Sequence, residues 1–142
     1  MDWSHRYEDR LREWKTLRNT VQPLQLTSSL LQINDWWMKA PLSTQHIAWE
    51  DWPDWPNAWE LLLDNTWSEM TRAIAIVYTI GLLFREDIKD VYIIDSNEGI
   101  LVTATPTKYI LGYCFGDIQA LNFEDITIAR TIDASMLTHY RR

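Results

Sequence analysis

Apolar side chains recur every three or four residues over the first 40 positions, which is the spacing of one face of an amphipathic helix. The first such face consists of Trp3, Tyr7, Leu11, Trp14, Leu17 and Val21. A second face, made of Leu26, Leu30, Ile33 and Trp37, follows Pro23 and ends before Pro41. Proline is tolerated only in the first turn of a helix. The pattern therefore predicts a helical hairpin over residues 1–40.

A second helical region is predicted over residues 58–85. Asn57 with Glu60, and Thr66 with Glu69, have the spacing of capping boxes that begin helices. The run from Ala73 to Phe84 is apolar on nearly all sides. A soluble protein accommodates such a helix only by surrounding it. We therefore expect a buried central helix over residues 70–84.

After residue 90 the pattern changes to the alternation typical of strands. Residues 91–95, 100–104 and 109–115 are predicted strands, and residues 96–99 and 105–108 are predicted turns. Residues 126–132 are a candidate fourth strand, and residues 135–142 are expected to be a frayed tail. Helices followed by strands predict an α+β domain, residues 1–142, in which the central helix packs on an antiparallel three- to four-stranded β-meander over residues 91–132.

Residues 41–57 show neither period and contain three prolines, so they are predicted to form a loop. Because residues before proline avoid the helical region, Trp52 and Trp55 are expected to be extended. Rigid aromatic side chains are strong interface anchors, and long ordered loops are often functional. We therefore predict a partner-binding surface in this loop and at the start of the next helix, formed by Trp49, Glu50, Asp51, Trp52, Asp54, Trp55 and Trp59. The alternative for each tryptophan is packing between the chain's own helices.

All nine tryptophans lie within the first 67 of 142 residues, and this region is also acidic. Residues 35–69 carry seven acidic side chains against Lys39 alone, in a chain of net charge −7. Phosphate backbones need clustered Lys and Arg, so nucleic acid is a poor partner. A basic protein surface, whose cations are also attracted to indole faces, suits the loop better. A sugar-stacking groove at Trp52 and Trp55, and acidic mimicry of nucleic acid, remain weaker alternatives.

Motifs for catalysis or cofactors are weak in this sequence. His5, His46 and His139 are far apart, which disfavours a metal site, and a Gly-rich phosphate loop is missing. Cys114 is the single cysteine and is expected to be an inert thiol, without a disulfide, in a reducing compartment. The longest apolar run is shorter than the roughly 20 residues of a membrane span, and the first residues do not resemble a signal peptide. We expect a soluble protein without a cofactor.

A capped, buried helix followed by an antiparallel meander resembles the core of transglutaminase-like and papain-like cysteine enzymes. That family carries a cysteine at the start of the central helix, a histidine on the following strands and an acid on the next. In this chain Ser68 stands at the helix start, and no histidine lies between His46 and His139. Without an imidazole to accept its proton, Ser68 is not an activated nucleophile. The resemblance therefore implies the fold without the chemistry.

A second resemblance rests on residues 34–41 (Asn-Asp-Trp-Trp-Met-Lys-Ala-Pro), Trp52-Pro53, residues 59–65 and residues 75–80. These segments are similar to small uncharacterised proteins of tailed phages, especially of marine and T4-like type. The resemblance implies a phage gene product located in the virion or the host cytoplasm. We expect a non-enzymatic protein that binds another protein, as a neck, tail or baseplate component or during assembly, with oligomerisation open. Alternatives are a host-directed inhibitor and a degenerate transglutaminase-like hydrolase.

Overall fold

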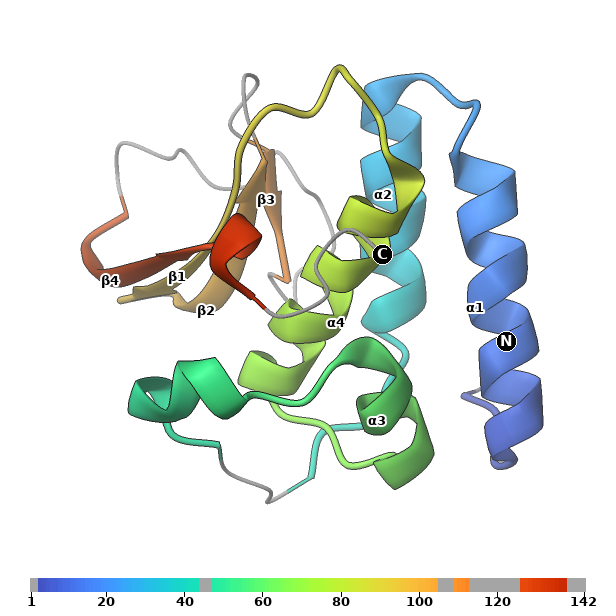
Figure 1. The fold of residues 1–142 in the computed structure, drawn as a ribbon, viewed down its shortest axis with the longest axis horizontal. Helices are drawn as coiled ribbons and strands as arrows, with labels where there is room; N and C mark the ends of the chain where they lie inside the picture. Colours follow the sequence, from blue (N-terminus) through green and yellow to red (C-terminus); the bar gives the residue numbers. More distant parts are fainter. Residues whose placement is uncertain (1–2, 44–46, 105–108, 113–125, 138–142) are drawn as a thin grey trace.

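The computed structural model describes residues 3–43, 47–104, 109–112 and 126–137. Its helices gather on one side of a four-stranded antiparallel sheet, and helix α4 (Glu69–Leu83) packs against both the sheet and the other helices (Figure 1). The predicted α+β class is confirmed. The predicted turn at 105–108, residues 113–115 of the third predicted strand, and Cys114, His46 and His139 lie outside the described residues.

The predicted helical hairpin consists of α1 (Tyr7–Val21) and α2 (Leu26–Trp37), which lie side by side (Figure 1). Helix α1 begins after Arg6, whose backbone is extended, so Trp3 precedes the helix instead of extending its apolar face. Its buried residues are Arg10, Trp14, Leu17 and Val21, and those of α2 are Ser29, Leu30, Ile33, Asn34 and Trp37.

Two capping boxes begin the next helices. Asn57 and Glu60 cap α3 (Ala58–Asp64), as the sequence predicts. The second box is formed by Ser68 and Thr71, so the predicted pair of Thr66 and Glu69 is wrong. Trp67 bridges to Leu42, and its carbonyl accepts the Ser43 N–H at 2.7 Å. This pairing holds the chain extended up to Ser68, where α4 begins.

Helix α4 is the centre of the molecule, as predicted. Every residue from Met70 to Gly81 is buried. The helix ends at Phe84, whose backbone is left-handed with φ of 52° and whose ring is exposed. Complete burial explains why α4 carries apolar residues on all sides rather than on one stripe.

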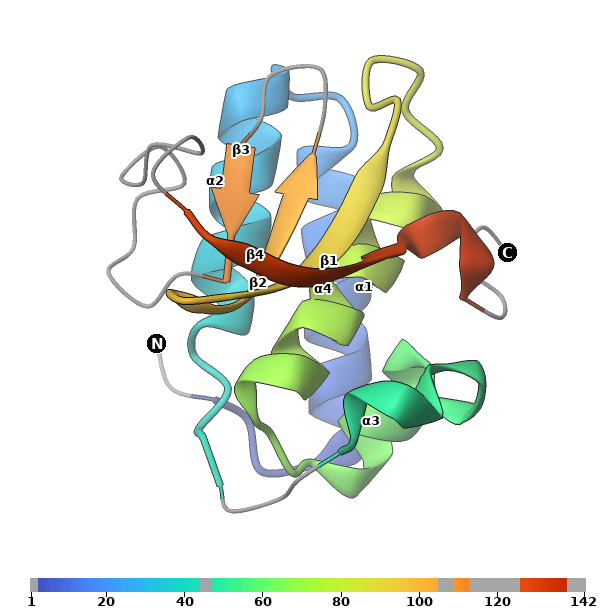
Figure 2. The same cartoon turned by 90° about the vertical axis from the view of Figure 1, so that its left-hand side faces the viewer.

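The first three strands form the predicted meander: β1 (Val91–Ser96), β2 (Gly99–Ala104) and β3 (Tyr109–Leu111). The fourth, β4 (Ile128–Asp133), pairs with β1, so the strand order is β3-β2-β1-β4 and β4 forms the opposite edge (Figure 2). The tail prediction is wrong for its first residues, because a short 3-10 helix, η3 (Ala134–Met136), follows β4 and Leu137 is buried.

Three arginines satisfy carbonyl groups at the carboxyl ends of helices. The Arg10 Nε donates to the Leu62 carbonyl of α3 at 2.9 Å. Arg72 donates to the Met38 and Ala40 carbonyls just after α2, and Arg85 donates to the Leu24 carbonyl after α1 at 2.6 Å. Helix carboxyl ends have no intrahelical donors for their last carbonyls. Arg10 supplies such a donor to Leu62, and all three arginines link distant parts of the helical layer.

Six of the nine tryptophans form one network of ring contacts among the helices. We call Trp3, Trp14, Trp36, Trp37, Trp59 and Trp67 the core tryptophan cluster. The buried Thr79 hydroxyl accepts the indole N–H groups of Trp14 at 2.8 Å and Trp37 at 2.9 Å. The Asn65 side-chain oxygen likewise accepts those of Trp3 at 2.7 Å and Trp67 at 3.0 Å. Two oxygen atoms thus satisfy four indole donors.

Candidate functional site

The predicted partner-binding loop contains a 3-10 helix, η1 (Trp49–Asp54). The prediction that Trp52 is extended is wrong, because Trp52 lies within η1. Trp55 follows η1 and is extended, as expected before Pro56. Sequence reasoning missed this 3-10 helix because a helix of six residues is too short to show a periodic hydrophobic pattern.

Two of the loop's tryptophans face inward. Trp49 and Trp55 are each 8% exposed, and their rings meet edge to face with centroids 5.7 Å apart. The Trp55 indole donates to the Ala48 carbonyl at 3.0 Å. We call Trp49 and Trp55 the loop pair. Both side chains are therefore part of the core. For these two tryptophans the alternative, packing within the chain, is correct.

The remaining predicted site residues divide between surface and core. Glu50, Asp51 and Asp54 are exposed, and Trp52 is half-buried. Trp59 is also half-buried and packs edge-on against Trp14, with ring centroids 5.2 Å apart. The part of the prediction that reaches the surface is therefore Glu50, Asp51, Trp52 and Asp54, which we call the acidic edge.

Arg130 of β4 connects the loop to the sheet. Its guanidinium donates to Glu50 at 2.7 Å and to Asp95 of β1 at 2.8 Å, and it lies 5.0 Å from the centre of the Trp49 ring. The hydrogen bond to Asp95 raises the pKa of Arg130 above its ordinary value. Sequence reasoning missed Arg130 because 80 residues separate it from Glu50 and no local pattern links them.

The resemblance to transglutaminase-like enzymes drawn from the sequence singled out Ser68, which lies at the start of α4. Here the Ser68 hydroxyl accepts the Thr71 N–H at 3.2 Å, and the Ser68 N–H donates to the Thr71 hydroxyl at 2.7 Å. Ser68 is therefore engaged as a helix cap. His5, the histidine within the described residues, is exposed and lies in the segment before α1.

The β1–β2 turn closes over the first turn of α4. A side chain at Gly99 would lie 3.1 Å from either carboxylate oxygen of Glu69, and Gly99 has a φ of +110°. Only glycine readily adopts this conformation and allows this approach. Gly99, at the start of β2, therefore lies directly against the Glu69 side chain in the first turn of α4.

Within the part of the chain that the structure describes, no three His, Cys, Asp or Glu side chains gather as a metal site would require. Among the same residues, no helix has both the length and the apolar composition that crossing a membrane requires.

No protein-family model matches this chain, and no curated protein sequence matches it significantly. Among solved structures, the chain is similar to calcium-bound LapG of Legionella pneumophila, with a TM-score of 0.69. The alignment covers 92% of this chain and 77% of LapG, at 12% sequence identity. LapG has a transglutaminase-like protease fold. At this identity the likeness concerns the fold, and it supports the fold-level resemblance drawn from the sequence.

Proposed function

We propose that this chain is a non-enzymatic phage protein that uses a transglutaminase-like fold to bind another protein, as a structural or assembly component of the virion. One observation carries the proposal: Ser68, at the start of α4, is held in a capping box with Thr71. The Ser68 hydroxyl accepts the Thr71 N–H, and no histidine pairs with Ser68 within the described residues. This arrangement supports a protein that keeps the transglutaminase-like fold without its chemistry.

The acidic edge is the surface we assign to the partner. Asp51 and Asp54 are exposed and flank the half-buried Trp52. Carboxylates around an aromatic ring favour a partner surface with Arg or Lys, because the ring face attracts cations and the carboxylates pair with them. The buried rings of the loop pair anchor η1 and therefore hold the acidic edge in place. This lowers the conformational entropy that the loop would lose on docking.

Quantitative mass spectrometry of purified particles tests the proposal. A phage that encodes the chain is expected to carry it in stoichiometric amounts. The double variant Asp51→Lys with Asp54→Lys is expected to lower its copy number at least several-fold, because reversed charges repel a basic partner.

The matched control is Glu86→Lys with Glu98→Lys, which reverses the same number of exposed carboxylates in the loop after α4 and in the β1–β2 turn. This control is expected to enter particles at the wild-type level. Complete absence of the wild-type chain from particles would remove the virion role. Equal incorporation of both double variants would remove the acidic edge.

A degenerate hydrolase is the second candidate, because LapG shares the fold. Its test is hydrolysis of activated esters and peptide substrates by the wild-type chain and by Ser68→Ala. We expect both proteins to show the same background rate. A wild-type activity that Ser68→Ala abolishes would establish the hydrolase and contradict the non-enzymatic proposal.

A further inference from the structure

Strand β4 has an open outer side. It lies at one end of the sheet and pairs with β1, and no other strand of the described residues pairs with it. Five consecutive residues, 127–131, are exposed, although the side chains of a half-buried strand alternate between a buried and an exposed face. Both faces of this part of β4 are therefore open. The outer backbone groups of such an edge form a template to which an extended segment can add as a further strand.

The pairing of β4 with β1 limits the length of such a segment. The register shifts near the end of β1, so Ala129 has no partner there. From Arg130 to Asp133 the pairing is regular, and the chain then enters η3. Bulges and short edge strands discourage two sheets from pairing edge to edge. The regular part of β4 therefore suits a short extended segment rather than the edge of another sheet.

The surroundings of this open side are acidic. The acidic edge lies at the same end of the molecule as β4, and its Glu50 pairs with Arg130 at 2.7 Å (Figure 1). The two carboxylates that pair with Arg130, those of Glu50 and Asp95, more than compensate its single cation. Asp51 and Asp54 form no ion pair with any described residue. A strand added beside Arg130 would therefore meet a negative surface.

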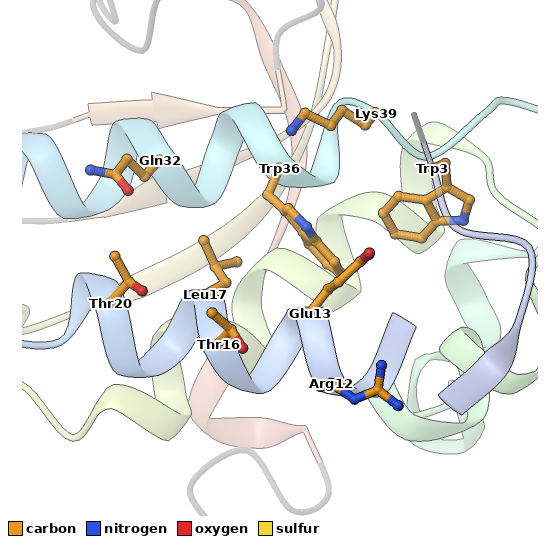
Figure 3. Close-up of a pocket in the computed structure, with 9 residues that line it drawn as sticks. All are labelled: Trp3, Arg12, Glu13, Thr16, Leu17, Thr20, Gln32, Trp36 and Lys39. Atoms are coloured by element: carbon orange, nitrogen blue, oxygen red, sulfur yellow. The ribbon is translucent and has the colours of Figure 1, made fainter. Parts of the chain in front are cut away.

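The pocket between α1 and α2 differs from this surface in its charge. Its volume is about 320 Å³, and its lining combines the Glu13 carboxylate with the cations of Arg12 and Lys39 (Figure 3). Mixed charges of this kind favour no class of ligand. The open side of β4 has one sign of excess charge, so the chemistry of its partner can be assigned.

We propose that the open side of β4 binds a short extended segment of a protein partner as an additional strand, with Lys or Arg at alternate positions. This inference rests on the basic partner proposed above and names its mode of binding. Backbone hydrogen bonds to β4 hold the segment, and its alternate side chains lie on the Arg130 face, beside the acidic edge. A second copy of this chain suits the site less well, because a net charge of −7 makes two copies repel each other.

Synthetic peptides test this assignment on the isolated full-length chain. The probe is a capped seven-residue peptide of alternating lysine and valine, and the amide signals of the chain are followed by NMR. This peptide is expected to bind, whereas the matched peptide of glutamate and valine is not. Amide exchange is expected to slow at alternate residues of β4, because only every second residue of a strand directs its N–H to the same side.

Methylation of the peptide backbone separates strand addition from simple charge attraction. One peptide carries methyl groups on its lysine amides and a second carries them on its valine amides, so their charges are equal. In an added strand one set of amides faces β4 and the other faces solvent. One methylated peptide is therefore expected to lose about tenfold or more in affinity, while the other binds like the parent. Equal affinity of the two methylated peptides would overturn the proposal.

Two double variants test the contribution of charge. Asp51→Lys with Asp54→Lys is expected to weaken binding of the lysine–valine peptide about tenfold. The control, Asp35→Lys with Glu86→Lys, reverses two exposed carboxylates on α2 and after α4 and is expected to leave binding unchanged. Equal weakening by both variants would contradict a site beside the acidic edge.

The wild-type chain supplies two further outcomes. Failure of the lysine–valine peptide to bind it would overturn the proposal. Protection of β4 amides that rises with the concentration of the chain alone would assign the edge to a second copy and overturn it as well. A chain that binds one methylated peptide selectively but is absent from particles would contradict the virion role and leave the β4 site established.

Discussion

Trp14 and Trp37 of the core tryptophan cluster and Trp55 of the loop pair satisfy their indole donors in different ways. In the cluster, the Trp14 and Trp37 donors meet at Thr79, which is 65 and 42 residues away in the sequence. In the loop pair, the Trp55 donor meets the Ala48 carbonyl only seven residues away. The first arrangement breaks only when helices separate, whereas the second can open by local motion of the loop. Burial alone, at 0% for Trp14 and 8% for Trp55, does not show this difference.

The acidic edge belongs to the same loop as the loop pair. Arg130 links the loop to β1 and β4 through two exposed ion pairs and the face of Trp49. Exposed ion pairs contribute little to global stability. Burial of Trp49 and Trp55 therefore holds the loop on the fold, and the contacts of Arg130 add a small contribution at its surface.

The largest effect is expected for Thr79→Val, which keeps the side-chain shape and removes the acceptor shared by Trp14 and Trp37. Two buried indole donors would lose their partner, at a cost of about 2–5 kcal/mol in the free energy of unfolding. Urea denaturation measures the loss. Thr79→Ser keeps the hydroxyl and serves as the control. Equal stability of the valine and serine variants would show that the shared acceptor does not hold the cluster together.

A smaller loss, about 1–2 kcal/mol, is expected for Asn65→Gly. Glycine fits the left-handed backbone at this position, where φ is 54°, but it removes the oxygen that accepts the Trp3 and Trp67 donors. Trp67 is completely buried and cannot turn to water, whereas the partly exposed Trp3 can. The same urea experiment applies, with Asn65→Asp as the variant that keeps the oxygen. A glycine variant as stable as wild type would contradict this role.

The smallest effect on global stability is expected for Arg130→Gln, which removes the cation above Trp49. The urea midpoint is expected to stay within error of wild type, while hydrogen exchange at the Trp55 indole becomes several-fold faster. Exchange at Trp14 and Trp37 should not change, because their donors open only with the helical layer. If all three indoles accelerate together, the loop and the cluster form one cooperative unit and the comparison fails.

How much of the candidate site was predictable depends on the residue. Polarity correctly placed Glu50, Asp51 and Asp54 at the surface. The same reasoning did not assign Trp49 and Trp55 to the core, because an indole is suited equally to a core and to an interface. Arg130 was missed because its contacts with Glu50 and Trp49 are made across the fold.

By itself the sequence determined the local elements: the helical hairpin, the Asn57 cap, the buried, largely apolar α4 and the first three strands. Each of these follows from periodicity, capping residues or turn residues within a few positions, and such signals act before any long-range contact is made. The tertiary structure alone decided that β4 pairs with β1, that Thr79 and Asn65 each satisfy two indoles, and which face of the loop remains in water. Apart from the contact of Asn65 with Trp67, these outcomes depend on residues far apart in the sequence, such as Trp3 and Asn65 or Arg130 and Glu50, whose proximity is set by how the helical layer and the sheet pack together.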